Sequence, residues 1–314
     1  MNVYMKSHNI RTLLALSFAI LFVSLSPAHA DVYIDEMGRS VTIPSRPKRI
    51  VSLAPNITEI LFALGLDREI VGVTMFSDYP KAAGSKPKVG SFVNVSLEKV
   101  ASLNPDLIIG TADGNKKETV EQLEQIGFPV YVINPGSFKE ILETTLNIGV
   151  ITGREKQAKK VVRDLQERID TVVSLTENLK KPGVFFQVGI DPVITVGRNT
   201  LQDKLIELAG GVNIYGDVMT RYPSCGIEEI VARKPDIIIV SSMKRGGNFP
   251  RIRNKWMKWN NIPAVKNDRV YTIESNLTDH SSPRIVDGLE EIVRIIHPEV
   301  KNRGLGQHRT SRKD

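Results

Sequence analysis

The sequence predicts an α/β protein whose two lobes are joined by one long helix. Three observations carry this prediction. Short apolar segments alternate with helical patterns, residues 154–180 form one uninterrupted amphipathic pattern, and the segment after it repeats features of the segment before it. Short strands that alternate with helices are typical of βαβ units on a mostly parallel sheet. A chain of 314 residues is long enough for two such lobes.

The first thirty residues have the composition of a secretory signal peptide. Lys6 and Arg11 precede the apolar run Leu13–Leu25, and Ala28-His29-Ala30 predicts cleavage after Ala30. The alternative, a membrane anchor, needs about 20 apolar residues, and this run is shorter. No cysteine follows the run to accept a lipid. We therefore expect an exported, soluble protein without a lipid anchor.

The formal charge of +7 is concentrated at the two ends of the chain. Residues 1–30 contribute +2 and residues 301–314 contribute +4, which leaves +1 for the body. A nearly neutral body does not favour nucleic acid as a partner. The single cysteine excludes an internal disulfide and a cysteine-cluster metal site.

The chain divides by its patterns into successive segments after the signal peptide (1–30). These are a hairpin with a proline-containing linker (31–48), an N-terminal lobe (49–152), a joining helix (153–181), a C-terminal lobe (182–300) and a basic, disordered tail (301–314). Predicted strands are Ile50–Leu53, Ile70–Val73, Leu107–Ile109, Val130–Ile133, Val184–Val188, Ile194–Val196, Ile237–Val240 and Val270–Ile273.

The joining helix is predicted from Arg154–Lys180, which contains neither glycine nor proline and has apolar residues at steps of three and four. Lys181-Pro182-Gly183 ends it. At about 1.5 Å per residue, such a helix extends about 40 Å. A long surface helix within one domain is the alternative. The repeated pattern on both sides favours a strut between two lobes.

Residues 98–109 and 228–239 share Glu, Pro, Asp and an apolar strand at identical offsets, 130 positions apart. This repeat therefore indicates two related lobes. Glu98 and Glu228 each lie near the start of a predicted helix, where the helix dipole favours a carboxylate. The functional alternative is that both lobes present one carboxylate on the same outer face, to a symmetric basic partner.

A weaker repeat concerns two helix starts. Asn56-x-x-Glu59 and Thr200-x-x-Asp203 both have the form of a capping box, and each predicted helix ends at a glycine.

Motifs of the common enzyme classes are absent from the sequence. It contains no G-x-S-x-G, no P-loop, no H-E-x-x-H and no G-x-G-x-x-G after a strand. After the signal peptide only His280, His297 and His308 remain, which makes a three-histidine metal site hard to assemble. We therefore expect no enzyme and no metal site of the protein's own, with an exported α/β enzyme as the alternative.

Residues 49–65 resemble the opening signature of class III periplasmic binding proteins, which serve ABC importers for cobalamin, haem and ferric siderophores. The resemblance covers about residues 45–297 and is strongest to the members that bind cobalamin (vitamin B12). Its further pieces are Ser77–Pro80, Phe185–Pro192, Leu201–Leu208, Gly210–Ile214 and Ser282–Ile285. It implies two Rossmann-like lobes on one backbone helix, as in the helical backbone metal receptors. The ligand would lie between the lobes, with little hinge closure.

The resemblance also implies a role and partners. The protein would capture cobalamin or a related corrinoid in the periplasm and deliver it to an ABC importer, as a monomer that performs no chemistry and needs no cofactor. Haem or a ferric siderophore is the alternative ligand. Glu98 and Glu228 match the two lobe-tip glutamates that bind the permease dimer.

By the same resemblance, eight residues match ligand-contact positions: Phe76, Phe92, Tyr222, Asn276, Leu277, Thr278, Asp279 and His280. Phe76 and Phe92 are also compatible with an ordinary core. His280 is compatible with a hydrogen bond to the ligand or with ligation of cobalt or haem iron. Cys225, in the loop of Tyr222, is a weaker candidate ligand. The basic residues 244–258 favour a solvated helix face over a siderophore site.

Overall fold

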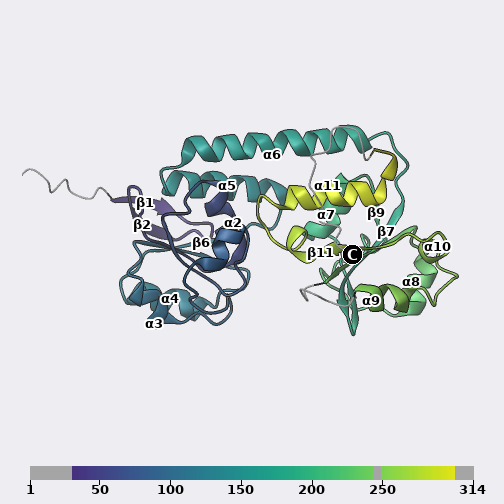
Figure 1. Ribbon diagram of the computed structural model, residues 1–314, viewed down its shortest axis with the longest axis horizontal. Helices are drawn as coiled ribbons and strands as arrows, with labels where there is room; N and C mark the ends of the chain where they lie inside the picture. The colour runs from purple at the N-terminus through teal and green to yellow at the C-terminus, as the bar shows by residue number, and fades with distance from the viewer. Residues whose placement is uncertain (1–29, 243–248, 301–314) are drawn as a thin grey trace, which may run out of the picture.

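The computed structural model describes residues 30–242 and 249–300. The predicted signal peptide up to residue 29 and the basic tail lie outside this range. Two α/β lobes lie side by side beneath α6 (Glu155–Thr176), which runs along the top of both (Figure 1). The expectation of two α/β lobes with a joining helix is confirmed.

The N-terminal lobe contains a parallel sheet in the order β4-β3-β5-β6, preceded by the antiparallel hairpin β1-β2. Every residue of β5 and β6 is buried, as expected for a parallel sheet covered by helices on both faces. The strands are β1 (Ala30–Ile34), β2 (Ser40–Pro44), β3 (Ile50–Ser52), β4 (Ile70–Val73), β5 (Leu107–Thr111) and β6 (Val130–Ile133). The helices are α2 (Pro55–Ala63), η1 (Lys81–Ser85), α3 (Leu97–Ser102), α4 (Lys117–Gln125) and α5 (Phe138–Ile151).

The C-terminal lobe contains a sheet in the order β11-β10-β7-β8, with β9 beside the start of β7. Its edge strand β8 runs antiparallel to β7, so this part of the chain is a hairpin rather than a further βαβ unit. The strands are β7 (Gly183–Ile190), β8 (Val193–Thr195), β9 (Val212–Asn213), β10 (Ile237–Ser242) and β11 (Val270–Glu274). The helices are α7 (Leu201–Leu208), α8 (Ile227–Arg233), α9 (Phe249–Trp256), α10 (Pro263–Lys266), η2 (Ser275–Leu277), α11 (Ile285–Ile296) and η3 (Pro298–Val300).

The aspartate of the sequence repeat has the same structural role in both lobes. The Asp106 carboxylate accepts hydrogen bonds from the backbone N–H groups of Lys48 (2.7 Å) and Arg49 (2.8 Å), just before β3. The Asp236 carboxylate accepts one from the N–H of Gly183 (2.8 Å), the first residue of β7. Each aspartate thus ties together the starts of two neighbouring parallel strands.

Helix α6 contributes side chains to the cores of both lobes. Ala158 packs in the N-terminal core, whereas Leu165, Ile169 and Val172 pack in the C-terminal core. Arg168 pairs with Asp287 (2.7 Å) and Glu290 (2.8 Å) of α11, which fixes the helix against the second lobe. The helix is shorter than the predicted 27 residues, but one continuous element still joins the two cores.

One of the two predicted capping boxes is wrong. Thr200 caps α7 as predicted, since its side chain accepts a hydrogen bond from the N–H of Asp203 (3.1 Å). The N-cap of α2 is Ala54, which makes no side-chain cap, because Pro55 already begins that helix. Glu59 is therefore not a capping residue, and its buried carboxylate faces the other lobe.

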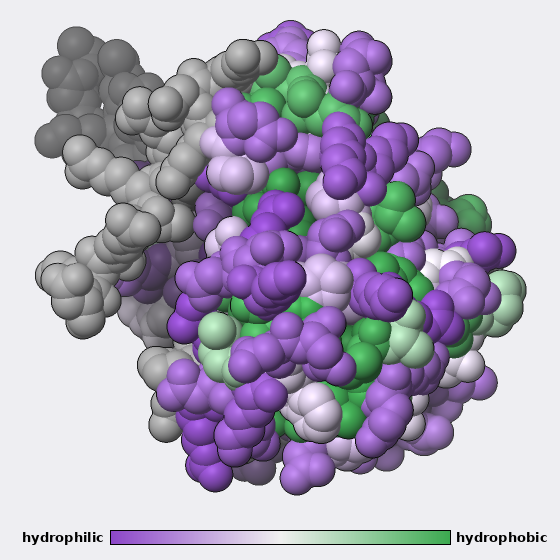
Figure 2. Space-filling model, turned by 90° about the vertical axis from the view of Figure 1, so that its right-hand side faces the viewer, coloured by the Kyte–Doolittle hydropathy of each residue, from purple (hydrophilic) through white to green (hydrophobic). Residues whose placement is uncertain are grey.

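Within residues 30–242 and 249–300, no helix combines the length and the apolar character needed to cross a membrane. The end face of the C-terminal lobe is largely hydrophilic, with hydrophobic side chains in small separate patches (Figure 2).

Gly149 of α5 permits the close approach of α6, because an added Cβ would collide with Cβ of Ala158. We expect Gly149→Ala to lower the free energy of unfolding by about 1–3 kcal/mol, as overpacked cores do. Ala158→Gly removes the obstructing methyl group at a cost of about 1 kcal/mol. In urea denaturation, the double variant should then lose less free energy of unfolding than the two single variants lose in sum. Strict additivity would contradict this packing.

Candidate functional site

A cavity of about 520 Å³ lies between the two lobes. Its walls come mainly from segments that follow the carboxyl ends of parallel strands in both lobes, where ligands of α/β proteins bind. The N-terminal lobe contributes Ala54, Pro55, Asn56, Phe76, Phe92, Thr111, Asp113 and Pro135. The C-terminal lobe contributes Ser275, Asn276, Asp279, His280 and Ser281.

The N-terminal wall carries two phenylalanines. Phe76 follows β4 and is 52% exposed, so it presents its ring to solvent at the cavity. Phe92 lies against Gly114, which has a φ of +123° and where any Cβ would collide with the ring. This wall is therefore apolar, and its shape depends on a glycine.

Buried Asn115 holds three segments of the N-terminal wall together. Its side-chain amide donates to the carbonyls of Leu53 (3.1 Å) and Phe92 (2.6 Å), and its oxygen accepts from the N–H of Thr111 (2.8 Å). With all of these bonds made inside the lobe, the wall is preorganised.

The C-terminal wall is polar and is formed by the segment after β11. The Asp279 carboxylate accepts hydrogen bonds from Gln202 of α7 (3.0 Å) and from the Thr278 hydroxyl (2.9 Å). Burial raises the pKa of Asp279, although these hydrogen bonds oppose the rise. The cavity thus has an apolar wall on one lobe and a wall of hydrogen-bonding groups on the other.

A clasp joins the lobes beside the cavity, and we define it as Glu59 with His280, Ser282 and Arg284. Nδ1 of His280 lies 3.1 Å from Oε1 of Glu59, the Ser282 hydroxyl donates to Oε2, and Arg284 donates to Oε1 at 3.2 Å. Arg284 also stacks on the ring of Tyr79, 3.6 Å from its centroid. The clasp therefore connects His280, which lines the cavity, to the other lobe.

The structure brings five of the eight predicted contact residues to the cavity: Phe76, Phe92, Asn276, Asp279 and His280. Thr278 is fully buried beneath the segment, so its side chain does not reach the cavity. Leu277 does not line it either, and its carbonyl packs against Gly288 of α11.

Tyr222 is not part of the cavity lining, and its side chain is 47% exposed. Burial raises its pKa, Arg221 lowers it, and the carboxylates of Asp279 and Asp113 raise it further. Since both carboxylates belong to the cavity lining, Tyr222 lies near the cavity rather than in its wall.

Glu98 and Glu228 occupy equivalent positions, each as the second residue of a short helix. Those helices, α3 and α8, lie on the side of their lobes away from α6 (Figure 1). Both side chains are exposed, and within the described part of the chain neither forms an ion pair. The two helices that carry these glutamates, one in each lobe, therefore both lie away from α6.

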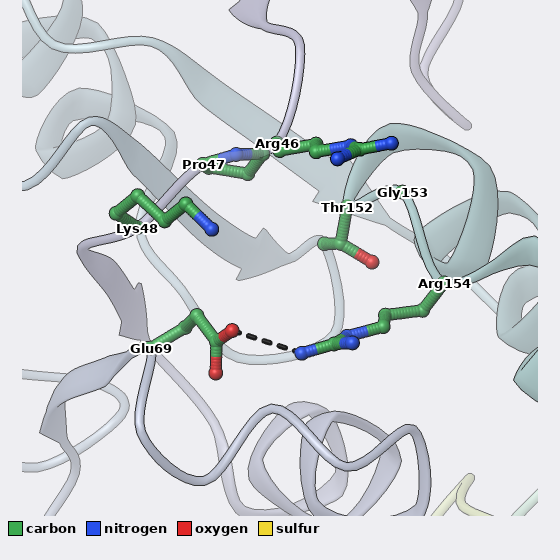
Figure 3. A pocket seen from close by; sticks show the side chains of 7 residues that line it. All are labelled: Arg46, Pro47, Lys48, Glu69, Thr152, Gly153 and Arg154. Atoms are coloured by element: carbon green, nitrogen blue, oxygen red, sulfur yellow. Dashed lines mark hydrogen bonds and ion pairs between the residues drawn. The ribbon is translucent and has the colours of Figure 1, made fainter.

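A smaller cavity of about 280 Å³ lies in the N-terminal lobe and is lined by Arg46, Lys48 and Arg154 (Figure 3). Arg154 is paired with Glu69 at 2.9 Å, and no aromatic side chain lines the cavity. It is therefore a poorer candidate than the cavity between the lobes. Nowhere in residues 30–242 and 249–300 do three His, Cys, Asp or Glu side chains gather as a metal site.

Sequence reasoning missed Glu59, Asn115 and Gln202 as parts of this site. Asn115 and Gln202 act from below the cavity, and nothing in their local sequence distinguishes them from other polar residues. The signal for Glu59 was an acidic residue on the buried face of a helix, between apolar neighbours at 57, 60 and 61.

Cys225 packs beside the apolar cluster around Phe185 and does not line the cavity. Burial raises the pKa of its thiol, the nearby Tyr215 hydroxyl opposes this, and Glu229 adds to it. Because the thiolate is the reactive form, we expect alkylation by iodoacetamide to rise with pH at a higher midpoint in the native protein than in urea. A native midpoint at or below the unfolded one would contradict this environment.

Comparison with known proteins identifies the family. A vitamin B12-binding protein of Vibrio parahaemolyticus is 28% identical over 263 residues, which cover 83% of this chain and 94% of that protein. The uncharacterized ABC transporter substrate-binding lipoprotein YvrC of Bacillus subtilis is 33% identical over 272 residues, covering 84% and 85%. The crystal structure of the periplasmic vitamin B12 binding protein BtuF of Vibrio cholerae matches with a TM-score of 0.70 and 28% identity, covering 83% of this chain and 100% of that chain. The family model for periplasmic binding proteins matches residues 50–277, and the chain therefore belongs to the periplasmic binding protein family.

Proposed function

We propose that this protein captures cobalamin in the cavity between its lobes and delivers it to an ABC importer. The observation that carries the proposal is the asymmetric cavity, with Phe76 and Phe92 on one lobe facing a polar segment on the other. A corrin ring is a broad disc with apolar faces and amide arms. Aromatic walls suit the faces, and Asn276, Asp279 and His280 suit the arms. Two relatives whose names specify vitamin B12 support the same ligand.

The cavity is preformed in this proposal. Asn115 fixes the apolar wall, and the Glu59 clasp fixes the polar segment against the other lobe. Binding then requires little ordering of loops or side chains, which favours affinity. Because the protein only binds and releases its cargo, cobalamin is a transported ligand and not a cofactor.

The partner at the membrane is a permease dimer with a basic face. Glu98 and Glu228 support this, because each lobe presents one exposed carboxylate at an equivalent helix start, without an ion pair to any described residue. Opposite charges on matching surfaces mainly accelerate and orient association. We propose that one monomer of this protein docks with one carboxylate on each permease subunit.

The protein reaches the periplasm through a signal peptide that is cleaved after Ala30. The relative from Bacillus subtilis is named a lipoprotein. In this chain the only cysteine is Cys225, far from the predicted cleavage site, which supports a protein without a lipid anchor.

Ligand binding is tested with cyanocobalamin and one pair of neighbouring variants. We expect the protein to retain cyanocobalamin through desalting, seen as corrin absorbance in the protein fraction. Phe76→Ala should weaken the affinity for cyanocobalamin by about tenfold or more in titration calorimetry. The variant loses the free energy gained by burying the aromatic ring against the ligand, which is about 1.5–3 kcal/mol. Met75→Ala is the matched control, because Met75 is equally exposed (57%) but does not line the cavity.

Retention of haem or a ferric siderophore with no retention of cyanocobalamin would refute the cobalamin assignment and favour the alternative ligand. Equal losses for Phe76→Ala and Met75→Ala would place the ligand elsewhere.

Docking is tested with charge reversal on two faces of the molecule. We expect Glu98→Lys combined with Glu228→Lys to abolish uptake in cells that depend on this receptor, while cyanocobalamin affinity of the purified protein stays unchanged. The control, Glu167→Lys with Glu177→Lys, makes the same charge change on α6 and at its end. Normal uptake by the first double variant, or equal loss by both, would contradict docking through the lobe tips.

A further inference from the structure

His280 is held in the cleft by only one of its two ring nitrogens. Nδ1 is bonded to Glu59, whereas Nε2, on the far side of the ring, has no hydrogen-bond partner among the described residues. The side chain is 23% exposed and lines the cavity between the lobes. The imidazole is therefore fixed at one end and open at the other.

The remaining contacts of Glu59 bear on the protonation of this ring. Arg284 donates to the same carboxylate oxygen as His280 and supplies the positive charge that a buried carboxylate requires. Ser282 donates to the second oxygen. Glu59 thus needs His280 only as an N–H donor. With the proton on Nδ1, Nε2 carries a lone pair.

A carboxylate that receives the N–H of an imidazole while the other nitrogen is free is the arrangement that orients metal-ligating histidines. Such a carboxylate fixes the tautomer and the orientation of the ring. No free-ion site surrounds His280, because the described residues contain no group of three further ligands. The metal would have to arrive already chelated, with one axial position open to exchange.

We propose that Nε2 of His280 ligates the metal of the bound chelate, with Glu59 as the positioning residue. The inference rests on the proposed function, in which the chelate is cobalamin. The step is a ligand exchange without redox chemistry: a Co(III)–nitrogen bond to Nε2 forms, the bond from cobalt to its axial water breaks, and the water leaves. Other polar residues of the cavity are less suited. The Asp279 carboxylate is already hydrogen-bonded by Gln202 and Thr278, and an amide such as that of Asn276 is a weak ligand.

The wild-type protein alone provides the first test. Aquocobalamin carries an exchangeable axial water, whereas the cyanide of cyanocobalamin is not displaced by imidazole. We expect bound aquocobalamin to show the absorption spectrum of an imidazole–cobalamin adduct, and bound cyanocobalamin to keep its own spectrum. If both are bound and the spectrum of aquocobalamin is unchanged, ligation is refuted and the proposed function stands. If neither is bound, the proposed function fails, and the inference fails with it.

Two variants test which residues are responsible for the ligation. The measured quantity is the ratio of the affinities for aquocobalamin and cyanocobalamin, because a general loss of binding lowers both affinities and leaves their ratio unchanged. Wild type should prefer aquocobalamin by about tenfold or more, or about 1.4 kcal/mol. In His280→Gln the ratio should fall to about one and the adduct spectrum should vanish. Glu59→Gln keeps an acceptor oxygen but loses the charge, so its ratio should lie between the two. If His280→Gln keeps the affinity ratio of the wild type, His280 is not the metal ligand. If Glu59→Gln keeps that ratio, Glu59 does not position His280.

Discussion

The carboxylate of Glu59 is the contact on which the geometry of the cleft depends. It is buried at the boundary between the lobes, and His280, Ser282 and Arg284 of the other lobe all bond to it. Removing one partner of a buried charged contact, which leaves the other charge uncompensated, costs about 3–5 kcal/mol. The clasp therefore ties the segment from His280 to Arg284, next to the polar wall of the cavity, to α2 of the other lobe.

Two further features extend this constraint over the molecule. Arg284 stacks on Tyr79 of the first lobe, and α6 contributes Ala158 to one core and Leu165 to the other. A rotation of the lobes would have to disturb the clasp and the packing of α6 together. Under the proposed function, the ligand would meet walls that already exist, and the importer would bind the loaded protein through Glu98 and Glu228.

Much of the fold could be predicted from the sequence, because strands, helix ends and the repeat depend on local patterns. The repeat that contains the aspartates at 106 and 236 is an example, since it is visible in the sequence although their bonds to the starts of neighbouring strands are not. The clasp could not be predicted. Glu59 sits in a motif that has the form of a capping box, and its partners lie 221 to 225 positions away. The burial of Thr278 was also not predictable, because it depends on how the segment turns through η2.

In the proposed function, a preformed cavity held by the Glu59 clasp receives cobalamin. A crystal structure of the protein with cyanocobalamin tests it most directly. We expect the corrin ring between Phe76 and Phe92 on one side and the segment from Ser275 to Ser281 on the other, with the bond from Arg284 to Glu59 intact. A ligand bound outside this cavity, or a rotation of the lobes that breaks the clasp, would contradict it.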